Sequence, residues 1–178
     1  MNKSFFGVIG LGVMGKSLSL NIAEKGFSLS VYNINEAGEE EIVKNFIDDN
    51  QGFRNIQGYS HLPEFVKSLE QPRKILLMIK AGKTIDLVID QLIPLLDKND
   101  ILIGITTSGN SLNILKVLKY ARSKKISTLG FLGSSGGKCK NFCDIKLMVP
   151  SDNTARIQEC HIFLAHFILQ SAEDLLIK

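Results

Sequence analysis

Phe5-Phe6-Gly7-Val8-Ile9-Gly10-Leu11-Gly12-Val13-Met14-Gly15 is the stretch that decides the fold of this chain. It reads as an apolar strand that enters a Gly10-x-Gly12-x-x-Gly15 turn, and a helical pattern follows from Lys16 to Lys25. In this context Gly10 permits a tight turn, Gly12 lets a pyrophosphate approach the backbone, and Gly15 lets the helix pack closely on the strand. The helix N-terminus then offers N–H groups to the phosphates. The stretch predicts a dinucleotide site formed by Gly10, Leu11, Gly12, Val13, Met14 and Gly15.

Short apolar runs alternate with helical patterns along the rest of the chain. We expect strands near 5–10, 28–33, 55–58, 74–79, 101–106, 126–132 and 145–149. Helices fit near 13–25, 36–49, 61–70, 83–96, 111–124 and 154–175, with a short one at 137–142. This alternation is typical of a parallel sheet covered on both faces. We therefore predict one domain over residues 1–178, a doubly wound, Rossmann-like α/β/α sandwich with about seven strands in the order 3-2-1-4-5-6-7.

The composition is that of an ordinary globular chain. Of its 178 residues, 44% are hydrophobic and 22% charged, and the net charge is +3. The positive charges are scattered, which argues against a nucleic-acid partner. The sequence has no apolar run of membrane-spanning length and no signal-peptide layout, so we expect a cytoplasmic protein.

The three cysteines are Cys139, Cys143 and Cys160. Cys139 and Cys143 lie four residues apart, a spacing that could hold a metal on a helix. The sequence places no second Cys/His pair at zinc-finger spacing, so we favour buried free thiols and expect no metal.

Several short motifs occur in the first hundred residues. They are Ile9-Gly10-Leu11-Gly12-Val13-Met14-Gly15, Leu20-Asn21-Ile22, Val31-Tyr32-Asn33, Pro72-Arg73-Lys74-Ile75, Ile79-Lys80-Ala81-Gly82 and Leu92-Ile93-Pro94-Leu95-Leu96-Asp97. Through these motifs residues 1 to about 100 resemble the NADP-binding N-terminal domain of 6-phosphogluconate dehydrogenases. The resemblance implies that Asn33, Lys80 and Ala81 also lie beside the cofactor. The alternative for Lys80 is a surface lysine in a turn.

The residue after Asn33 departs from the pattern of that family. The family usually has an arginine there, which would bind the 2′-phosphate of NADP, whereas this chain has Ile34. NAD would need an acidic side chain beside its ribose hydroxyls. This strand end has none unless Glu36 reaches back to them. Because a charge-assisted bidentate contact is among the strongest that a site makes, Ile34 predicts weak binding of NADP or NAD and little preference between them.

The sequence after Asp100 also departs from that family. In the dehydrogenases an Asp-Gly-Gly-Asn-Ser motif follows the fifth strand, and a helical domain with the catalytic lysine comes later. Neither occurs in this sequence. The departure predicts a chain that does not oxidise 6-phosphogluconate.

A different set of motifs occupies residues from about 101 to 178. The set contains Leu102-Ile103-Gly104-Ile105-Thr106-Thr107-Ser108-Gly109-Asn110-Ser111, Leu129-Gly130-Phe131-Leu132-Gly133, Gly136-Gly137-Lys138 and Val149-Pro150-Ser151-Asp152-Asn153-Thr154-Ala155-Arg156-Ile157-Gln158-Glu159. In these motifs the segment resembles the C-terminal half of a sugar isomerase (SIS) domain of the phosphoheptose isomerase family.

The hydroxyls of Thr106, Thr107, Ser108 and Ser111 precede a helix N-terminus, where they could bind a phosphate group. The resemblance assigns these four residues to a sugar phosphate. The alternative is that Ser111 caps the helix and the other residues form a turn.

Gln158 and His166 match the glutamine and the acid/base histidine of the isomerases. The family's glutamate partner belongs to the first half of its fold, for which this chain has no counterpart, so we expect both residues to be vestigial. His61 and Glu64 form a local pair that we interpret as surface residues.

Two resemblances that meet near Asp100 suggest an engineered chimera without evolved catalytic activity, which retains weak NAD(P) binding at the glycine turn. One alternative is a sugar-phosphate-binding or isomerase module acting through Thr106–Ser111. The other is an NAD(P)-dependent oxidoreductase of the 6-phosphogluconate dehydrogenase type. The expected partners are a small nucleotide or phosphate ligand and a second copy of the chain in a homodimer, for which the SIS resemblance implies the 154–175 helix as the interface. We expect no membrane and no nucleic acid.

Overall fold

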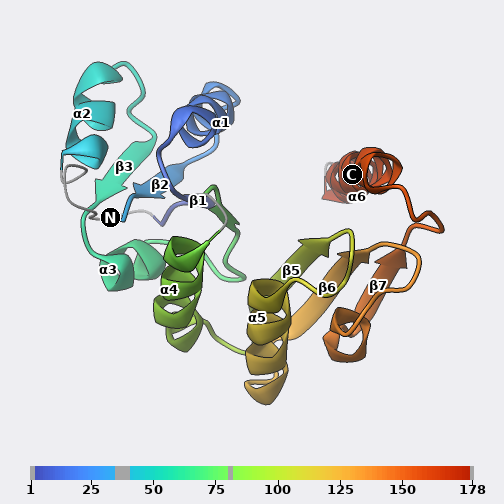
Figure 1. The fold of residues 1–178 in the computed structure, drawn as a ribbon. Coiled ribbons are helices and arrows are strands. Elements are labelled where there is room, and N and C mark those ends of the chain that lie inside the picture. The colour runs from blue at the N-terminus through green and yellow to red at the C-terminus, as the bar shows by residue number, and fades with distance from the viewer. Residues whose placement is uncertain (1–2, 35–40, 80–81, 177–178) are drawn as a thin grey trace. The chain divides into compact units, whose positions relative to one another are not determined.

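The computed structural model describes residues 3–34, 41–79 and 82–176, and its elements are labelled in Figure 1. The chain divides into two compact units, Met1–Asp100 and Ile101–Lys178. Each unit is a parallel sheet with helices, and the fold is α/β and Rossmann-like.

The first unit contains a four-stranded parallel sheet in the order β3-β2-β1-β4. Its elements are β1 (Phe6–Ile9), α1 (Val13–Glu24), β2 (Leu29–Tyr32), α2 (Ile42–Asp49), β3 (Ile56–Tyr59), α3 (Leu62–Lys67), β4 (Ile75–Leu77), α4 (Lys83–Leu92) and the 3-10 turn η1 (Ile93–Leu95). All four residues of β2 are buried, as expected for a strand covered on both faces.

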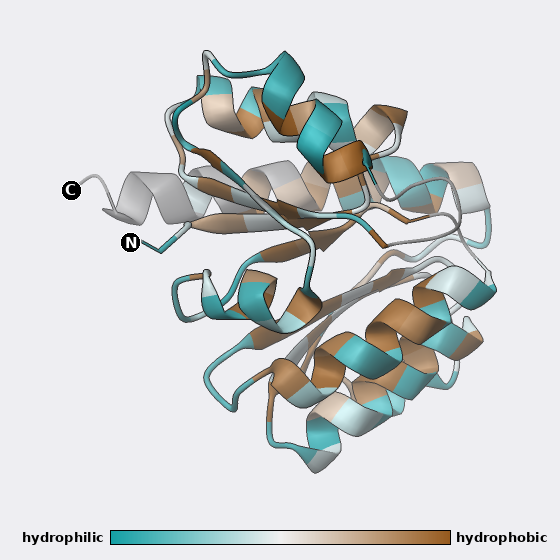
Figure 2. Ribbon diagram, turned by 90° about the vertical axis from the view of Figure 1, so that its left-hand side faces the viewer, coloured by the Kyte–Doolittle hydropathy of each residue, from teal (hydrophilic) through white to brown (hydrophobic). Residues whose placement is uncertain are grey.

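Alternate residues of β1 point to two different cores. Val8 packs with Val31 and with apolar residues of α1 and α2, whereas Ile9 packs with Phe65 and other residues of α3 and α4. In Figure 1, α1 and α2 lie on one side of this sheet and α3 and α4 on the other. Figure 2 shows apolar residues, in brown, along the strands. The period of two along β1 thus produces the layered unit.

The second unit contains a three-stranded parallel sheet in the order β5-β6-β7. Its elements are β5 (Ile101–Thr106), α5 (Leu112–Ser123), β6 (Ser127–Leu132), the 3-10 turn η2 (Cys139–Phe142), β7 (Ile145–Met148) and α6 (Thr154–Leu176). Leu115 and Leu118 of α5 pack with Leu132 and with both cysteines near η2. The helix α6 begins after Asn153, whose side-chain oxygen accepts hydrogen bonds from the backbone N–H groups of Ala155 and Arg156.

Some boundaries differ from the sequence predictions. Hydrogen bonding joins the seven strands as a four-stranded and a three-stranded sheet, and the predicted strand order holds within each. The helix expected over 83–96 ends at Leu92 and tightens into η1, since Pro94 lacks the N–H that an α-helical turn requires. The short helix expected at 137–142 is the 3-10 turn η2.

Cys139 and Cys143 are buried free thiols, as predicted, and burial raises the pKa of both. Cys160 is free and exposed. Within the described residues, no three His, Cys, Asp or Glu side chains gather as they would around a metal ion. Among the helices of residues 3–34, 41–79 and 82–176, none is long and apolar enough to cross a membrane.

A buried ionic network holds the end of the first unit. The Arg73 guanidinium contacts the carboxylates of Asp100 at 2.7 Å and Asp97 at 2.9 Å. Asp100 is 2% exposed, and its two oxygens also accept the backbone N–H groups of Arg73 and Asp97, both at 2.8 Å. The network fixes the segment that enters β4 to the segment that precedes Ile101.

Replacing Asp100 by Asn should destabilise the protein by about 3 kcal/mol, because the Arg73 charge then remains buried without its main partner. Urea unfolding followed by circular dichroism measures this loss. The matched control is Asp97→Asn, whose side chain is 55% exposed and which should cost less than about 1 kcal/mol. Equal losses in the two variants would contradict a dominant role for Asp100.

A second polar connection links β6 to the start of β7. The Asp144 carboxylate accepts hydrogen bonds from the Thr128 backbone N–H at 2.9 Å and from its hydroxyl at 2.8 Å. The Asp144 N–H in turn donates to the Thr128 hydroxyl at 2.9 Å. These hydrogen bonds, the one from the backbone N–H foremost, hold the pKa of Asp144 below its ordinary value of 3.8.

This lowered pKa predicts a pH-dependent contribution to stability. The folded state favours ionised Asp144, so the contribution is fully present above the unfolded pKa near 3.8 and disappears as the pH falls through the lower folded pKa. Urea unfolding of the wild type and of Asp144→Asn should therefore differ at pH 6 and converge toward pH 3. A difference that stays constant across this range would show that the ionised carboxylate is not the stabilising form.

Candidate functional site

The glycine turn brings three backbone segments into close contact at the carboxyl end of β1. Gly10 has a φ of +99°, and a Cβ there would lie 2.6 Å from the carbonyl oxygen of Met78. A Cβ on Gly15 would lie 1.8 Å from the carbonyl oxygen of Gly10. Around a Cβ placed on Gly12, by contrast, the described chain has no atom within 4 Å apart from those of Gly12 and its two sequence neighbours. Gly10 and Gly15 are thus required by packing, while Gly12 leaves open space above the turn.

The helix α1 starts directly from this open space. Lys16 N–H donates to the carbonyl of Gly12 at 2.9 Å, which closes the first helical turn. The preceding N–H groups have no carbonyl within the helix to which they can donate. Val13 is 84% and Met14 69% exposed, so the entrance to the helix is accessible. Donor groups at a positive helix end suit a phosphate anion.

Asn33 ties the end of β2 to the glycine turn. Its side-chain oxygen accepts the Leu11 N–H at 2.9 Å, and its amide nitrogen donates to the carbonyl of Ile34 at 3.0 Å. One residue earlier, the Tyr32 carbonyl accepts the N–H of Gly10 at 2.9 Å. The assignment of Asn33 to a cofactor contact stays a prediction, and what the structure shows is that Asn33 holds the backbone of the turn in place.

The sequence prediction missed Met78. Its N–H donates to the Ile9 carbonyl at 2.8 Å, and its backbone abuts Gly10, so the residue after β4 shapes the floor of the turn. An apolar residue at a strand end carries no sequence signal for this role. Lys80 and Ala81, which the resemblance places at the cofactor, lie outside the described residues.

In the second unit the predicted phosphate-binding hydroxyls form a compact turn between β5 and α5. Thr106 is buried, and its hydroxyl lies 2.8 Å from that of Ser111. The exposed Ser108 accepts the Asn110 N–H at 3.2 Å. Ser111 occupies the N-cap position, yet its hydroxyl pairs with Thr106 rather than capping the helix. Thr107, half-buried, completes the turn, and its assignment to a sugar phosphate stays a prediction.

The two residues matched to isomerase chemistry, Gln158 and His166, lie on α6. Gln158 is exposed, and the side chain of His166 lies outside the described part of the chain. His161 is buried, with its Nε2 3.3 Å from the Leu132 carbonyl and its ring edge-on to Phe131. His61 and Glu64 are exposed at the start of α3, which confirms their interpretation as surface residues.

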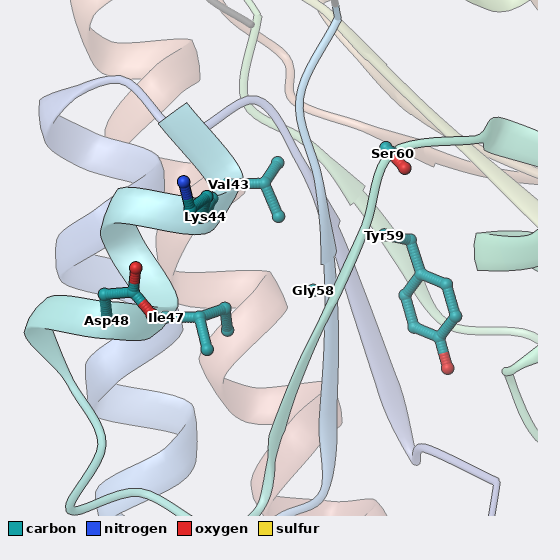
Figure 3. A pocket seen from close by; sticks show the side chains of 7 residues that line it. All are labelled: Val43, Lys44, Ile47, Asp48, Gly58, Tyr59 and Ser60. Atoms are coloured by element: carbon teal, nitrogen blue, oxygen red, sulfur yellow. The ribbon is translucent and has the colours of Figure 1, made fainter. Parts of the chain in front are cut away.

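A shallow pocket of about 300 Å³ lies apart from the glycine turn, between α2 and β3. Val43 and Ile47 cover Gly58, where a Cβ would lie 2.7 Å from Val43 and 2.9 Å from Ile47. Figure 3 shows the ring of Tyr59 pointing away from α2, on the other side of the strand. The remaining lining residues are Lys44, Asp48 and Ser60. The pocket exists because a glycine lets α2 lie close to β3, and it presents no cluster of groups suited to catalysis.

Comparison with known proteins gives a consistent family. The family described as the NAD binding domain of 6-phosphogluconate dehydrogenase matches residues 5–165. A Bacillus subtilis relative named 6-phosphogluconate dehydrogenase, NADP(+)-dependent, decarboxylating is 52% identical over 103 residues, which cover 58% of this chain and 21% of the relative. A solved 6-phosphogluconate dehydrogenase from Plasmodium falciparum is 32% identical with a TM-score of 0.56, over 70% of this chain and 26% of that one. The chain spans about a quarter of the length of the curated relatives it matches.

These comparisons correct the functional expectation. An engineered chimera without evolved activity is wrong as the main interpretation, because relatives named 6-phosphogluconate dehydrogenase are 43–52% identical over 103 to 134 residues, which cover 58–74% of the chain. The family match also continues past Asp100 to residue 165. A solved phosphoheptose isomerase from Neisseria gonorrhoeae overlaps 93% of this chain and 75% of its own, but at 21% identity and a TM-score of 0.48 it does not show a chimera.

The family match and the geometry of the glycine turn agree on the first unit. A strand, a turn that requires glycine at Gly10 and Gly15 and an accessible helix N-terminus occur in the order that a dinucleotide fold requires. This chain belongs to the family of the NAD binding domain of 6-phosphogluconate dehydrogenase.

Proposed function

We propose that this chain binds a nicotinamide dinucleotide at the glycine turn and serves an NAD(P)-dependent oxidoreductase of the 6-phosphogluconate dehydrogenase type. The observation that carries the proposal is the contrast within the turn. At Gly10 and Gly15, neighbouring backbone occupies the space that a Cβ would take. Of the three glycines of the turn, Gly12 alone faces open space, at the start of α1. A pyrophosphate requires such an approach to the backbone.

The residues present fit this group. The N–H groups at the start of α1 would hold the pyrophosphate, with the helix dipole favouring its negative charge. The Asn33 amide fixes the Leu11 backbone that borders the same turn. Val13 and Met14 offer exposed apolar surface beside it, suited to the face of a nucleotide ring.

When bound, the nicotinamide ring accepts or donates a hydride. The chain's own contribution is to bind and orient the dinucleotide, because the groups described at the turn are backbone donors and apolar side chains without an acid or a base. The relatives are named 6-phosphogluconate dehydrogenase, and we propose that the binding of the dinucleotide by this chain serves a reaction of that type.

Substitution of Gly12 by Ala tests the proposal. The new methyl group has room in the structure, and Gly12 has a φ of −67° that alanine adopts easily, so the free energy of unfolding should change by less than about 1 kcal/mol. The methyl group would occupy the space that the pyrophosphate needs, so the dissociation constants for NAD and NADP should rise by at least about tenfold. Calorimetric titration measures the binding, and wild-type affinity in this variant would contradict the proposed site.

The matched control is Gly15→Ala. Its Cβ would overlap the carbonyl oxygen of Gly10, so α1 must shift and the protein should lose about 1–3 kcal/mol of stability. If both variants lose binding but only Gly15→Ala loses stability, then Gly12 acts through contact with the ligand and Gly15 acts through the packing of the helix.

A further inference from the structure

The positive charge of this chain is concentrated in the second unit. Residues 101–151 contain eight lysines and arginines and a single acidic residue, Asp144. The net charge of the whole chain is only +3, so the remaining residues together carry an excess of negative charge. Positive charges that are scattered along a sequence argue against a nucleic-acid partner only if the fold also leaves them scattered. The structure of the second unit therefore decides whether these charges form a surface.

Three of the cations lie around the 3-10 turn η2. The Nζ atom of Lys119 lies 5.3 Å from the centroid of the Phe142 ring. One turn further along α5, the Arg122 guanidinium donates a hydrogen bond to the carbonyl of Asn141 at 2.5 Å. Lys146 follows η2 on β7, and the side chains of all three cations are exposed. We call Lys119, Arg122 and Lys146 the basic face.

The basic face lies on the side of the second sheet that α5 covers. A Cβ on Gly104 would lie 3.1 Å from Ile114 and 3.6 Å from Leu118, so this position of β5 points toward α5. Gly104 pairs in register with Gly130, and Gly130 pairs with Lys146. Residues that pair across neighbouring strands share one face of a sheet, so Lys146 is on the side of α5. In Figure 1, α5 lies on one side of this sheet and α6 on the other.

The one carboxylate near the basic face offsets only part of its charge. The Oδ2 atom of Asp144 accepts hydrogen bonds from the backbone N–H and the hydroxyl of Thr128. These bonds are the main cause of the lowered pKa of Asp144, and the charges of Arg122 and Lys146 lower it further. Both cations therefore lie within electrostatic range of the same carboxylate. With Lys119 as the third cation, the face keeps a net positive charge.

Stabilisation of α5 does not account for the whole basic face. Cations near the end of a helix interact favourably with its dipole, which explains Arg122 in the last turn and the lysines that follow it. Lys146 belongs to a strand, where this reason does not apply. An exposed group of cations from a helix and a strand attracts an anionic partner.

The surroundings of the basic face indicate which kind of anionic partner it fits. Between residues 113 and 144, all of which the structure describes, no large hydrophobic side chain is exposed. Protein interfaces depend on buried apolar or aromatic anchors, and a helix that lies on a membrane inserts apolar side chains. The phosphate backbone of a nucleic acid needs only cations, because its binding is driven by the release of counterions.

We propose that the basic face binds the phosphate backbone of a nucleic acid. Lys119, Arg122 and Lys146 each contact a phosphate group, and such contacts hold the chain on the nucleic acid without reading its sequence. This activity belongs to the second unit and is independent of the dinucleotide site, which belongs to the first.

Fluorescence anisotropy of a short labelled DNA duplex of mixed sequence, titrated with the full chain, tests the proposal. We expect a dissociation constant of about 100 μM or lower at 50 mM salt. Contact with about three phosphates should make the affinity fall by about fortyfold between 50 and 200 mM salt. Failure to bind at 50 mM salt, or binding that does not depend on salt, would overturn the proposal.

Replacing all three cations of the basic face by Gln locates the binding. The variant carrying Lys119→Gln, Arg122→Gln and Lys146→Gln should bind the duplex at least about tenfold more weakly and lose most of the salt dependence. Because Arg122 also holds the η2 backbone, the double variant Lys119→Gln with Lys146→Gln repeats the test with that hydrogen bond in place. Circular dichroism and the melting temperature check that each variant is folded.

The matched control removes the same charge from the first unit. Lys25, Lys67 and Lys98 are exposed there, and their joint replacement by Gln lowers the net charge of the chain equally. The control should keep its affinity for the duplex within about threefold of the wild type. An equal loss in the control and in the variants of the basic face would assign the binding to overall charge and overturn the proposal.

Two competitors distinguish a nucleic acid from other anionic partners. Poly-glutamate stands for an acidic protein, and vesicles that contain anionic phospholipid stand for a membrane surface. We expect unlabelled duplex to displace the labelled duplex at a concentration at least about tenfold lower, in charge equivalents, than either competitor. Displacement by poly-glutamate or by the vesicles at the same concentration would assign the basic face to that partner and overturn the proposal.

Discussion

The first unit depends on the contact between the backbone of α1 and the backbone at the end of β1. At Gly15 the helix lies so close to Gly10 that a single methyl group would overlap a carbonyl oxygen. Gly10 meets Met78 with similar closeness, so the turn, the helix and the segment after β4 share one point of contact. Because backbone atoms make this contact, its geometry is nearly independent of the flexible side chains around it. The helix N-terminus is therefore fixed above the strand ends before any ligand arrives, and such preorganisation lowers the entropy that binding must overcome.

The features of the fold that rest on local pattern could be read from the sequence. Alternation along β1 assigns Val8 and Ile9 to opposite cores. Asp152 and Asn153 are both candidates for the N-cap of α6, and the structure uses Asn153. The buried thiols at Cys139 and Cys143 and the surface positions of His61 and Glu64 follow from the same reasoning. The sequence pattern extends α4 too far, because the helical periodicity continues through Pro94 while the α-helical backbone ends at Leu92.

Features that depend on distant partners could not be predicted. Nothing in the sequence pairs Arg73 with Asp100, 27 residues away, or Thr128 with Asp144. The part that Asn33 plays in holding Leu11 is equally invisible, because an asparagine at a strand end suggests a ligand contact as readily as a structural one. The functional expectation failed for a related reason. Local motifs in residues 101–178 suggested a second family, whereas the match to one family extends over most of the chain.

Asn33 and Ile34 are adjacent residues with different structural roles. Asn33 uses both ends of its amide to support backbone, so most replacements there would disturb the turn itself. Ile34 contributes packing alone among the described contacts and supports no backbone group. In evolutionary terms, two adjacent codons encode positions that can change separately. A lineage could therefore replace the side chain at position 34 while the backbone that Asn33 supports stays as it is.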